Sequence, residues 1–271
     1  MTMQNRPTGY FRLGPVIPRN AILARMRALL AVPLFILFSA SAAQADSQAQ
    51  PVDLNLVIAV DISDSIDPDE LQLQREGYIA AFEDSEIVQA IRGGKYGRIA
   101  VSYFEWSDAT DQKLIVDWEI ISDGASAHAF STQLKLAPVQ RGHFTSISSA
   151  ISYALALLQR SPHQSDRRVI DISGDGRNND GAPLQTARAA ALSLNVTING
   201  LPIDNERSQQ ASNLEPGQIA KYYREEVIGG PDAFVVVAKS YIDIEHAIGR
   251  KLLREIAGKG RDETLRRAAL R

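Results

Sequence analysis

Short apolar segments of strand length alternate along this chain with segments whose apolar residues recur at helical spacing. Several of the strand-length segments are rich in Val and Ile and nearly continuous in hydrophobicity, as expected for strands buried on both faces of a sheet. The alternation therefore predicts an α/β fold in which helices cover both faces of a mostly parallel sheet. The predicted strands are 54–60, 98–104, 113–121, 168–173, 196–202 and 233–238.

The helical segments between the strands are amphipathic, and we expect their apolar residues to lie in the core rather than around a cofactor. The first helix has a recognisable start, because Asp67 is a favourable N-cap, Pro68 suits the first helical position and Glu70 can complete a capping box. The apolar sets are Leu71, Tyr78, Ile79 and Phe82; Ile147, Ile151, Leu155 and Leu158; Leu184, Ala187, Ala191 and Leu192; and Ile244, Ile248, Leu252 and Ile256.

Segments 98–104 and 113–121 are joined only by residues 105–112, which is too short for a crossover helix. We therefore expect these two strands to form an antiparallel hairpin at one edge. The predicted architecture is a doubly wound, mostly parallel sheet with one antiparallel edge strand and helices on both faces. In such sheets, ligands bind beyond the carboxyl ends of the strands.

Residues 1–45 have the layout of a secretory signal peptide. Arg19, Arg25 and Arg27 precede an apolar run, 28–42, that closes with a small-x-small sequence ending at Ala45. A positive flank, a short hydrophobic segment and a small-x-small end are typical of such peptides. We therefore expect cleavage near Ala45 and a periplasmic or secreted protein.

An uncleaved membrane anchor is the alternative for this segment. The apolar run contains Pro33 and is shorter than the roughly 20 residues that a spanning helix needs, so no stable membrane insertion is expected after cleavage. Met1 and Met26 both remain open as the start of translation. The predicted organisation is a signal peptide at 1–45, a short flexible leader at 46–53, one domain at 54–257 and a basic C-terminal tail at 258–271.

The charge balance of the exported chain argues against nucleic acid as a partner. The sequence has 29 basic and 32 acidic residues, and residues 1–45 contain five arginines and no acid. Without that segment, 24 basic and 32 acidic residues remain, a net charge of about −8, whereas nucleic-acid binding needs a basic surface. The chain has no cysteine and therefore neither a disulfide nor a thiolate zinc site.

The first predicted strand ends in a loop that offers three oxygen ligands. The sequence from Asp61 reads Asp-Ile-Ser-Asp-Ser, which puts one carboxylate and the hydroxyls of Ser63 and Ser65 on a single turn. Oxygens of this kind suit a hard divalent cation such as Mg²⁺. Asp and Ser are also ordinary turn and capping residues, so a metal site needs further ligands from elsewhere in the chain.

Two later loops can supply those ligands. Thr145 lies directly before a predicted helix, in the segment 141–146, and Asp175 lies between two glycines directly after the predicted strand 168–173. N-capping by Thr145 and a turn role for Asp175 are the structural alternatives. Because the carboxyl ends of parallel strands meet at one edge, we expect both residues to lie near Asp61.

With these three loops the chain resembles the von Willebrand factor type A (VWA) domain, from residue 54 to about 256. The resemblance includes the order of elements, the hairpin after the first helix and the Thr-x-Ile-x-x-Ala-Ile sequence that begins at Thr145. It implies a Rossmann-like fold and a metal-ion-dependent adhesion site for Mg²⁺, or else for Mn²⁺ or Ca²⁺. The exported context suggests a bacterial subgroup without a settled function. The implied ligands, direct or through water, are Asp61, Ser63, Ser65, Thr145 and Asp175.

The chain departs from the VWA pattern in three places. Two residues separate Gly142 from Thr145, where many relatives have one or none, so Ser146 could compete as the ligand. The third loop reads Ser-Gly-Asp-Gly around Asp175 instead of the commoner Thr-Asp-Gly. An insert at 204–232 is longer than a minimal domain requires, and it could carry partner specificity or cover an edge. Within it, we expect a loop at 205–213 and a short helix at 218–227.

The resemblance implies a binding role in which an open coordination position takes a Glu or Asp carboxylate of a partner protein. His143, Phe144 and Arg177 flank the predicted site and could form a rim around that acid. No catalytic residues are predicted, because the chain has no nucleophile elbow, no Walker loop and no His-Glu-x-x-His motif. The four histidines are far apart in the sequence.

A metal-dependent phosphohydrolase is the main alternative. Enzymes of the haloacid-dehalogenase type need Asp-x-Asp after the first strand, and this chain has Asp61-Ile62-Ser63. The general acid two positions after the nucleophile is therefore missing. A structural VWA module that binds no metal is the third interpretation.

Overall fold

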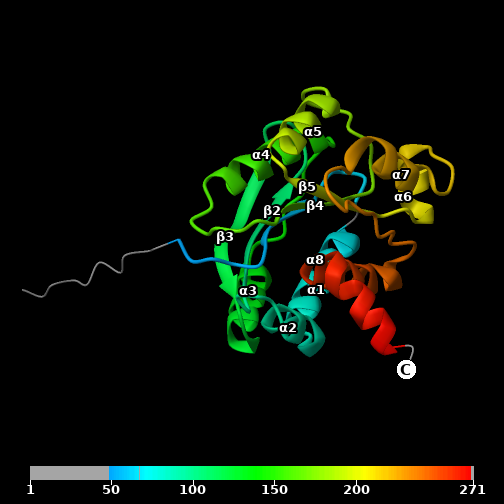
Figure 1. The fold of residues 1–271 in the computed structure, drawn as a ribbon. Coiled ribbons are helices and arrows are strands. Elements are labelled where there is room, and N and C mark those ends of the chain that lie inside the picture. Colours follow the sequence, from blue (N-terminus) through cyan, green and yellow to red (C-terminus); the bar gives the residue numbers. More distant parts are fainter. Residues whose placement is uncertain (1–48, 67, 270–271) are drawn as a thin grey trace, which may run out of the picture. The chain divides into compact units, whose positions relative to one another are not determined.

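A five-stranded mixed sheet in the order β3–β2–β1–β4–β5 runs through the protein (Figure 1). The structure is a computed structural model that describes residues 49–66 and 68–269. The predicted signal peptide and the predicted N-cap Asp67 lie outside these residues. The strands are β1 (Asn55–Asp61), β2 (Ile99–Trp106), β3 (Gln112–Ile121), β4 (Arg168–Gly174) and β5 (Thr197–Pro202).

Strand β1 lies at the centre and pairs in parallel with both β2 and β4, while β4 pairs in parallel with β5. Strands β2 and β3 are antiparallel, which confirms the predicted edge hairpin. The chain moves from β1 to one side of the sheet and later returns to its other side at β4. The strand order therefore changes direction between β1 and β4, where doubly wound sheets place their ligands.

Helices cover both faces of the sheet (Figure 1), and the predicted fold class is confirmed. One face carries α1 (Pro68–Glu83), α2 (Ser85–Arg92), α3 (Gly124–Leu136) and α8 (Tyr241–Ala269). The other face carries α4 (Ile147–Gln159), α5 (Leu184–Ser193), α7 (Gln218–Tyr222) and the π-helix η1 (Tyr223–Val227). Helix α6 (Glu206–Ser212) precedes α7.

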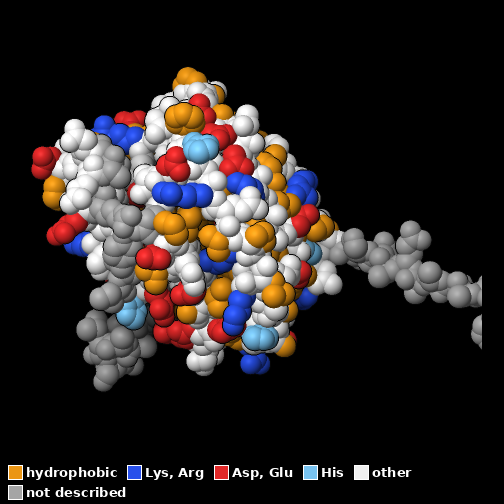
Figure 2. Space-filling view, turned by 180° about the vertical axis from the view of Figure 1, so that it is seen from behind, with side chains coloured by type: hydrophobic (Ala, Val, Ile, Leu, Met, Phe, Trp, Pro, Cys, Tyr) orange, Lys and Arg blue, Asp and Glu red, His pale blue; other side chains and the backbone are white. Residues whose placement is uncertain are grey.

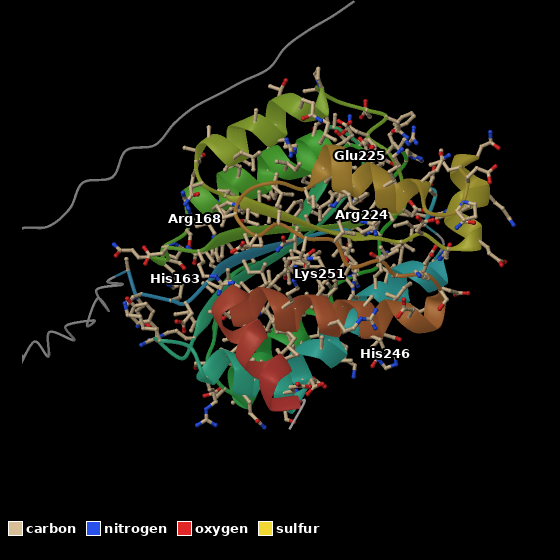
Figure 3. The ribbon with its side chains drawn as sticks, turned by 45° about the vertical axis from the view of Figure 1, so that its right-hand side comes forward. His163, Arg168, Arg224, Glu225, His246 and Lys251 are labelled. Atoms are coloured by element: carbon tan, nitrogen blue, oxygen red, sulfur yellow. The ribbon has the colours of Figure 1, made fainter. Side chains whose placement is uncertain are left out.

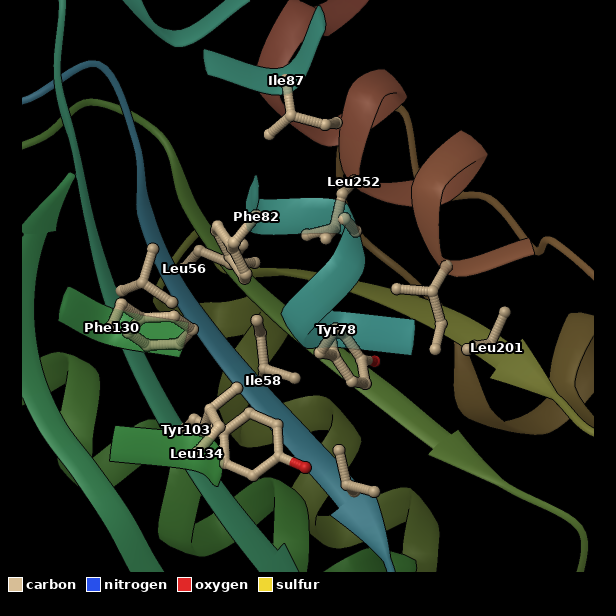
Figure 4. Close-up of a cluster of buried hydrophobic side chains, with 14 of the residues drawn as sticks. Leu56, Ile58, Tyr78, Phe82, Ile87, Tyr103, Phe130, Leu134, Leu201 and Leu252 are labelled. Carbon is tan, nitrogen blue, oxygen red and sulfur yellow. The ribbon is translucent and has the colours of Figure 1, made fainter. Parts of the chain in front are cut away.

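Alternate residues of β1 enter two separate hydrophobic clusters. Leu56 and Ile58 pack with the α1 side, whereas Val57 and Ala59 pack with the α4 side. Figure 4 shows the first cluster, in which Leu56 and Ile58 lie among aromatic side chains from α1 and α3. This alternation is the period-two pattern of a strand buried on both faces, and it holds β1 rigidly at the middle of the fold.

Two helices that the strand–helix alternation does not predict begin with ordinary capping residues. The backbone N–H of Glu86 donates to the carboxylate of Asp84 at 2.7 Å before α2. A reciprocal capping box between Asp123 and Ser126 starts α3. Both helices extend the cover of the sheet on the α1 side.

The predicted sixth strand, 233–238, is wrong. This segment lies beside β5 and forms only isolated bridges, at Gly200–Val235 and Ile203–Ala238. Backbone bonds do join the segment to β5, since the N–H of Gly200 donates to the Phe234 carbonyl at 3.1 Å and the N–H of Ala238 donates to the Pro202 carbonyl at 3.0 Å. Pro202 has no N–H to donate between these bonds, and the N–H of Phe234 donates to the side-chain oxygen of Asn199 at 3.0 Å, so the pairing is interrupted and no regular strand forms.

The loop predicted at 205–213 is also wrong in part, because α6 occupies most of it. Asn205 and Ser208 form a reciprocal cap, in which the backbone N–H of Ser208 donates to Asn205 Oδ1 at 2.8 Å and the backbone N–H of Asn205 donates to Ser208 Oγ at 3.0 Å. The helix expected at 218–227 is present as α7 followed by η1. Helix α8 is interrupted at Gly258, whose φ of 61° is left-handed.

A buried ionic cluster ties α8 to β4. Lys251 of α8 is 1 % exposed, contacts the Asp171 carboxylate of β4, and lies 2.6 Å from Glu255 Oε1. Asn199 Nδ2 donates to the same Glu255 oxygen at 3.1 Å. Burial, and then the Glu255 charge, raise the pKa of Asp171 to about 7, and Lys251 opposes that rise. Figure 3 shows Lys251 on the side of α8 that faces the sheet.

The surface carries both signs of charge. On the face shown in Figure 2, acidic and basic side chains are interspersed with apolar ones. None of the helices among the described residues has both the length and the apolar character needed to cross a membrane.

Candidate metal centre

Two buried carboxylates lie where the two central strands end. Asp61 is the last residue of β1, and Asp175 directly follows β4. The strands are parallel neighbours with Val60 opposite Ser173, so their next residues leave the sheet at the same edge. Both carboxylates are fully buried. The sheet therefore brings the first and third predicted loops together.

The first loop is a tight turn that gathers its oxygens. The backbone N–H of Ser63 donates to Asp61 Oδ1 at 2.8 Å, and the N–H of Ile66 donates to the Ser63 carbonyl at 3.0 Å. The hydroxyl oxygens of Ser63 and Ser65 are 3.0 Å apart. The alternate spacing in the sequence thus becomes one compact set of three oxygen-bearing side chains.

Contacts between the loops complete this set. Ser65 Oγ donates to Asp175 Oδ1 at 2.6 Å, which joins the first loop to the third. Thr145 Oγ1 lies 3.1 Å from the point where a Cβ on Gly176 would stand, so the hydroxyl is directly beside the third loop. A side chain at 176 would crowd Thr145, which explains the glycine after Asp175. All five predicted ligands lie around one point of the sheet edge.

Thr145 is held in this position by a two-way contact with Asn179. The backbone N–H of Thr145 donates to Asn179 Oδ1 at 2.9 Å, and the N–H of Asn179 donates to the Thr145 carbonyl at 2.9 Å. Ser146, the alternative ligand, points elsewhere, because its hydroxyl donates to the Asp180 carbonyl at 3.0 Å and its Oγ lies 3.0 Å from Ser149 Oγ. The geometry therefore favours Thr145 over Ser146.

The electrostatics of the site favour a cation. Among the described residues, Asp61 Oδ2 and Asp175 Oδ2 are buried and have no hydrogen-bond partner. Burial, and then the charge of Asp175, raise the pKa of Asp61 well above its ordinary value. Burial is also the main reason that the pKa of Asp175 rises to about 7; the Glu70 carboxylate adds to this rise, and the Ser65 hydroxyl opposes it. A bound cation would remove the cost of both buried charges.

The donor set fits a hard divalent cation. Two carboxylates and three hydroxyls provide only oxygen, which suits Mg²⁺, Mn²⁺ or Ca²⁺. Within the part of the chain that the structure describes, no group of three or more His, Cys, Asp or Glu side chains could hold a metal. The site therefore differs from a nitrogen- or sulfur-rich transition-metal site.

Three residues around the site are not predicted from the sequence to belong to it. Asn179 fixes Thr145, and Asn178 Oδ1 accepts from the backbone N–H of Ser148 at 2.8 Å at the start of α4. Glu70 of α1, predicted only as a capping-box residue, is buried near Asp175 and accepts from Asn205 Nδ2 at 2.6 Å. The Asn178-Asn179 pair beside Asp175 is a visible signal, whereas the local sequence of Glu70 does not indicate its place near the site.

The residues expected to form a rim are at the surface around the second and third loops. Phe144 is 57 % exposed, which is high for a large apolar side chain. His143 Nδ1 lies 3.0 Å from Asp64 Oδ2. The Arg177 guanidinium lies over the Tyr222 ring, 5.6 Å from its centroid. These three side chains thus lie on the loops that carry Thr145 and Asp175, and those of His143 and Arg177 contact residues next to the site.

The fold belongs to the VWA class. The chain is similar to a von Willebrand factor type A protein from Catenulispora acidiphila, at 12% identity and a TM-score of 0.54, over 76% of this chain and 43% of that one. It is also similar to the pilus adhesin SpaC from Lactobacillus rhamnosus GG, at 14% identity and a TM-score of 0.53, over 77% and 30%.

A third similar structure is proximal thread matrix protein 1 from the mussel byssus, described with a zinc-occupied MIDAS motif. The identity is 13% and the TM-score 0.52, over 76% of this chain and 48% of that chain. The present chain thus spans less than half of each of these three proteins, and at such identities the likeness concerns the fold.

The chain belongs to the family described as "Protein of unknown function (DUF1194)", which matches residues 51–260. This range contains all five predicted ligands and the whole insert. No curated protein matches the chain.

Proposed function

We propose that the protein is a binding module that holds a divalent cation, Mg²⁺ in the first place, through Asp61, Ser63, Ser65, Thr145 and Asp175. The observation that carries this proposal is the pair of buried carboxylate oxygens without a partner, surrounded by hydroxyls from two loops. Two unpaired acids in a buried position are unfavourable unless a cation joins them.

The charge of the site defines what the bound cation can do. Two carboxylates neutralise a divalent ion formally, and the three hydroxyls are neutral ligands. Mg²⁺ prefers six oxygens, so at least one coordination position remains for an oxygen from outside the protein. A Glu or Asp carboxylate of a partner protein fits this position, and in this proposal His143, Phe144 and Arg177, which lie on the neighbouring loops, form a rim around it.

The similar structures support binding over catalysis. One of them is described as a pilus adhesin, and another as a matrix protein with a zinc-occupied MIDAS motif. In this chain, the position of a phosphohydrolase general acid holds Ser63, which is buried in the ligand turn. Asp64 is 53 % exposed and lies 3.0 Å from the ring of His143. We therefore infer a binding protein and not an enzyme.

We also propose that the protein works in the periplasm, or outside the cell, after cleavage near Ala45. The sequence pattern of residues 1–45 is the basis for this proposal. An exported protein whose metal centre lies at one edge of the fold is suited to joining another exported protein.

Metal affinity is expected to rise with pH. The pKa of Asp175 is raised to about 7, and that of Asp61 is also raised well above its ordinary value, so the metal-free site binds protons that the cation must displace. We expect Mn²⁺ to bind at least about tenfold more weakly at pH 6 than at pH 8, since one proton per ion weakens binding tenfold per pH unit below the pKa. Calorimetry in buffers of different ionisation enthalpy would measure both the affinity and the released protons. An affinity that does not change over this range would contradict the assignment of both acids as ligands.

Partner binding is expected to require the cation. The mature protein, immobilised and loaded with Mg²⁺, should retain a specific protein from envelope extracts, and EDTA should release it. Asp61→Ala is the matched control, since it removes a ligand and leaves the exposed rim unchanged. Equal retention by the two forms, or retention that survives EDTA, would exclude a cation bridge.

A further inference from the structure

The insert at 204–232 is folded against the metal centre. Asp204 organises its start, because its carboxylate accepts from the backbone N–H of Gly217 at 3.2 Å and of Ala220 at 3.1 Å. These bonds fix the beginning of α7, and η1 continues directly from it. The insert is therefore an ordered part of the domain and not a loose surface loop.

The insert contacts the loop that carries Asp175. The backbone N–H of Asn178 donates to the Tyr222 hydroxyl at 3.2 Å. The Arg177 guanidinium lies over the same ring, and it also approaches Gln218 Oε1 at 3.5 Å. The third ligand loop is thus held from one side by the insert.

Tyr223, the first residue of η1, reaches the metal centre itself. Its side chain is fully buried, and its hydroxyl has no hydrogen-bond partner among the described residues. A Cβ on Gly174 would stand 2.8 Å from the Tyr223 hydroxyl and 2.6 Å from Asp61 Oδ2. The phenol and the unpartnered carboxylate oxygen therefore approach the same glycine.

This convergence explains why the third loop reads Ser-Gly-Asp-Gly. Any side chain at 174 would overlap both Tyr223 and Asp61, so the glycine leaves the space in which they meet. A phenylalanine at position 223 would fill the same space as the tyrosine ring. It would also avoid burying a hydroxyl group, which is unfavourable when that group has no hydrogen-bond partner. Short π-helical segments such as η1 are frequent at functional sites, where they redirect a side chain.

We propose that Tyr223 is a positioning residue of the metal centre. Its hydroxyl and Asp61 Oδ2 both lack a hydrogen-bond partner within the described part of the chain and lie beside the same glycine, and with a cation bound the hydroxyl would donate to Asp61 Oδ2 and hold that carboxylate in the binding orientation. The inference rests on the proposed function, because it assigns a role at the same site. Asp61 Oδ1 already accepts from the backbone N–H of Ser63. Bonds to both oxygens fix the rotation of the carboxylate and leave lone pairs for the cation. The insert, through Tyr223, is then part of the metal centre.

Tyr223→Phe tests this role. Removing one outer hydrogen bond from a metal ligand weakens metal binding about 10- to 100-fold, and we expect a loss in that range for Mn²⁺ and Mg²⁺ by calorimetry. The thermal midpoint without metal should stay unchanged, whereas the increase produced by saturating Mn²⁺ should shrink. Tyr78→Phe is the matched control, since Tyr78 is equally buried and its hydroxyl also lacks a partner, but it lies in the cluster on the α1 side. That variant should bind metal like the unaltered protein.

The outcomes separate the two proposals. Equal affinity of Tyr223→Phe and the unaltered protein overturns the positioning role and leaves the proposed metal site standing. A variant that loses stability without metal to the same degree as it loses affinity shows a packing role, which also overturns the inference. If the unaltered protein binds neither Mn²⁺ nor Mg²⁺, the proposed function fails and the inference fails with it.

Discussion

We expect Asp61→Ala to weaken the proposed binding of Mg²⁺ and Mn²⁺ by more than about 100-fold, while the fold remains intact. Loss of a direct carboxylate ligand should exceed the largest effects of outer-shell changes, which reach about 100-fold. In this variant, Asp175 is the single carboxylate that remains among the proposed ligands. Calorimetry at pH 8 would measure the affinity, and circular dichroism would verify the fold.

The same substitution should not destabilise the metal-free protein at pH 8. The folded-state pKa of Asp61 is raised by burial first and by Asp175 second, so its ionised form opposes folding once the pH exceeds the pKa of the unfolded chain. Removing that carboxylate removes an unfavourable charge. We therefore expect a thermal midpoint without metal that is equal to or above that of the unaltered protein.

Asp64→Ala is the control, because this neighbouring acid is exposed and belongs to the same loop. It should leave metal affinity within about twofold, as expected for a surface charge outside the ligand set. Unchanged affinity in Asp61→Ala would remove the adhesion-site assignment. A metal-dependent phosphoesterase activity that disappears in Asp61→Asn would favour the hydrolase instead.

Lys251→Met destabilises the folded protein by about 3–5 kcal/mol, the usual cost of breaking a buried ion pair by removing one partner. The variant leaves Asp171 and Glu255 together in the interior without their cation. Methionine fills a similar volume, so a cavity contributes little. Urea denaturation would measure the loss, with Lys221→Met as a control on a lysine whose side chain is 69 % exposed.

The loss should be larger at pH 8 than at pH 5.5. The folded-state pKa of Asp171 is about 7 against an ordinary value of 3.8, so its favourable contribution exists at low pH and disappears as the pH rises through 7. Lys251 holds this pKa down, and its removal raises the pKa of Asp171 further.

Adding Asp171→Asn to the Lys251→Met variant should recover part of the stability at pH 8. A loss that is independent of pH would show that the cluster is not ionised as described.

The sequence is sufficient to predict the sheet and the edge hairpin. Segments such as 54–60 are continuous in hydrophobicity, and this pattern leaves few alternatives to a strand buried on both faces. The short connection 105–112 permits only an antiparallel pair. The proximity of Asp61 and Asp175 can be predicted in the same way, because both residues lie at the carboxyl ends of strands that meet at one edge of the sheet.

Other elements depend on side-chain contacts that periodicity does not contain. The segment 233–238 is as apolar as a strand, but its pairing with β5 is interrupted at Pro202, which has no N–H, and Asn199 accepts the N–H of Phe234. Helix α6 has only one apolar residue, Ala211, and starts from the reciprocal cap of Asn205 and Ser208. Lys251 lies among the apolar residues of α8, and its burial is tolerable because Asp171 of β4 and Glu255 of α8 both pair with it.

The surroundings of the candidate site are the least predictable part. Tyr223 lies 162 positions after Asp61 in the sequence, and its approach depends on the path of the insert and on the missing side chain at Gly174. The side-chain oxygen of Asn179 accepts from the backbone N–H of Thr145 in another loop, and the spacing of residues in the sequence does not indicate such a contact. Such contacts become visible only when the loops are placed in space.

The two-way contact between Thr145 and Asn179 has a consequence for how an ion reaches the centre. Because each residue holds the backbone of the other, the second and third loops move as one piece. Of the five ligand side chains, only that of Ser65 is partly exposed. A cation that binds here would approach most easily beside Ser65, and binding to Asp175 would compete with the bond from this hydroxyl. The Ser65 turn would then be the part of the site that has to rearrange when the ion enters.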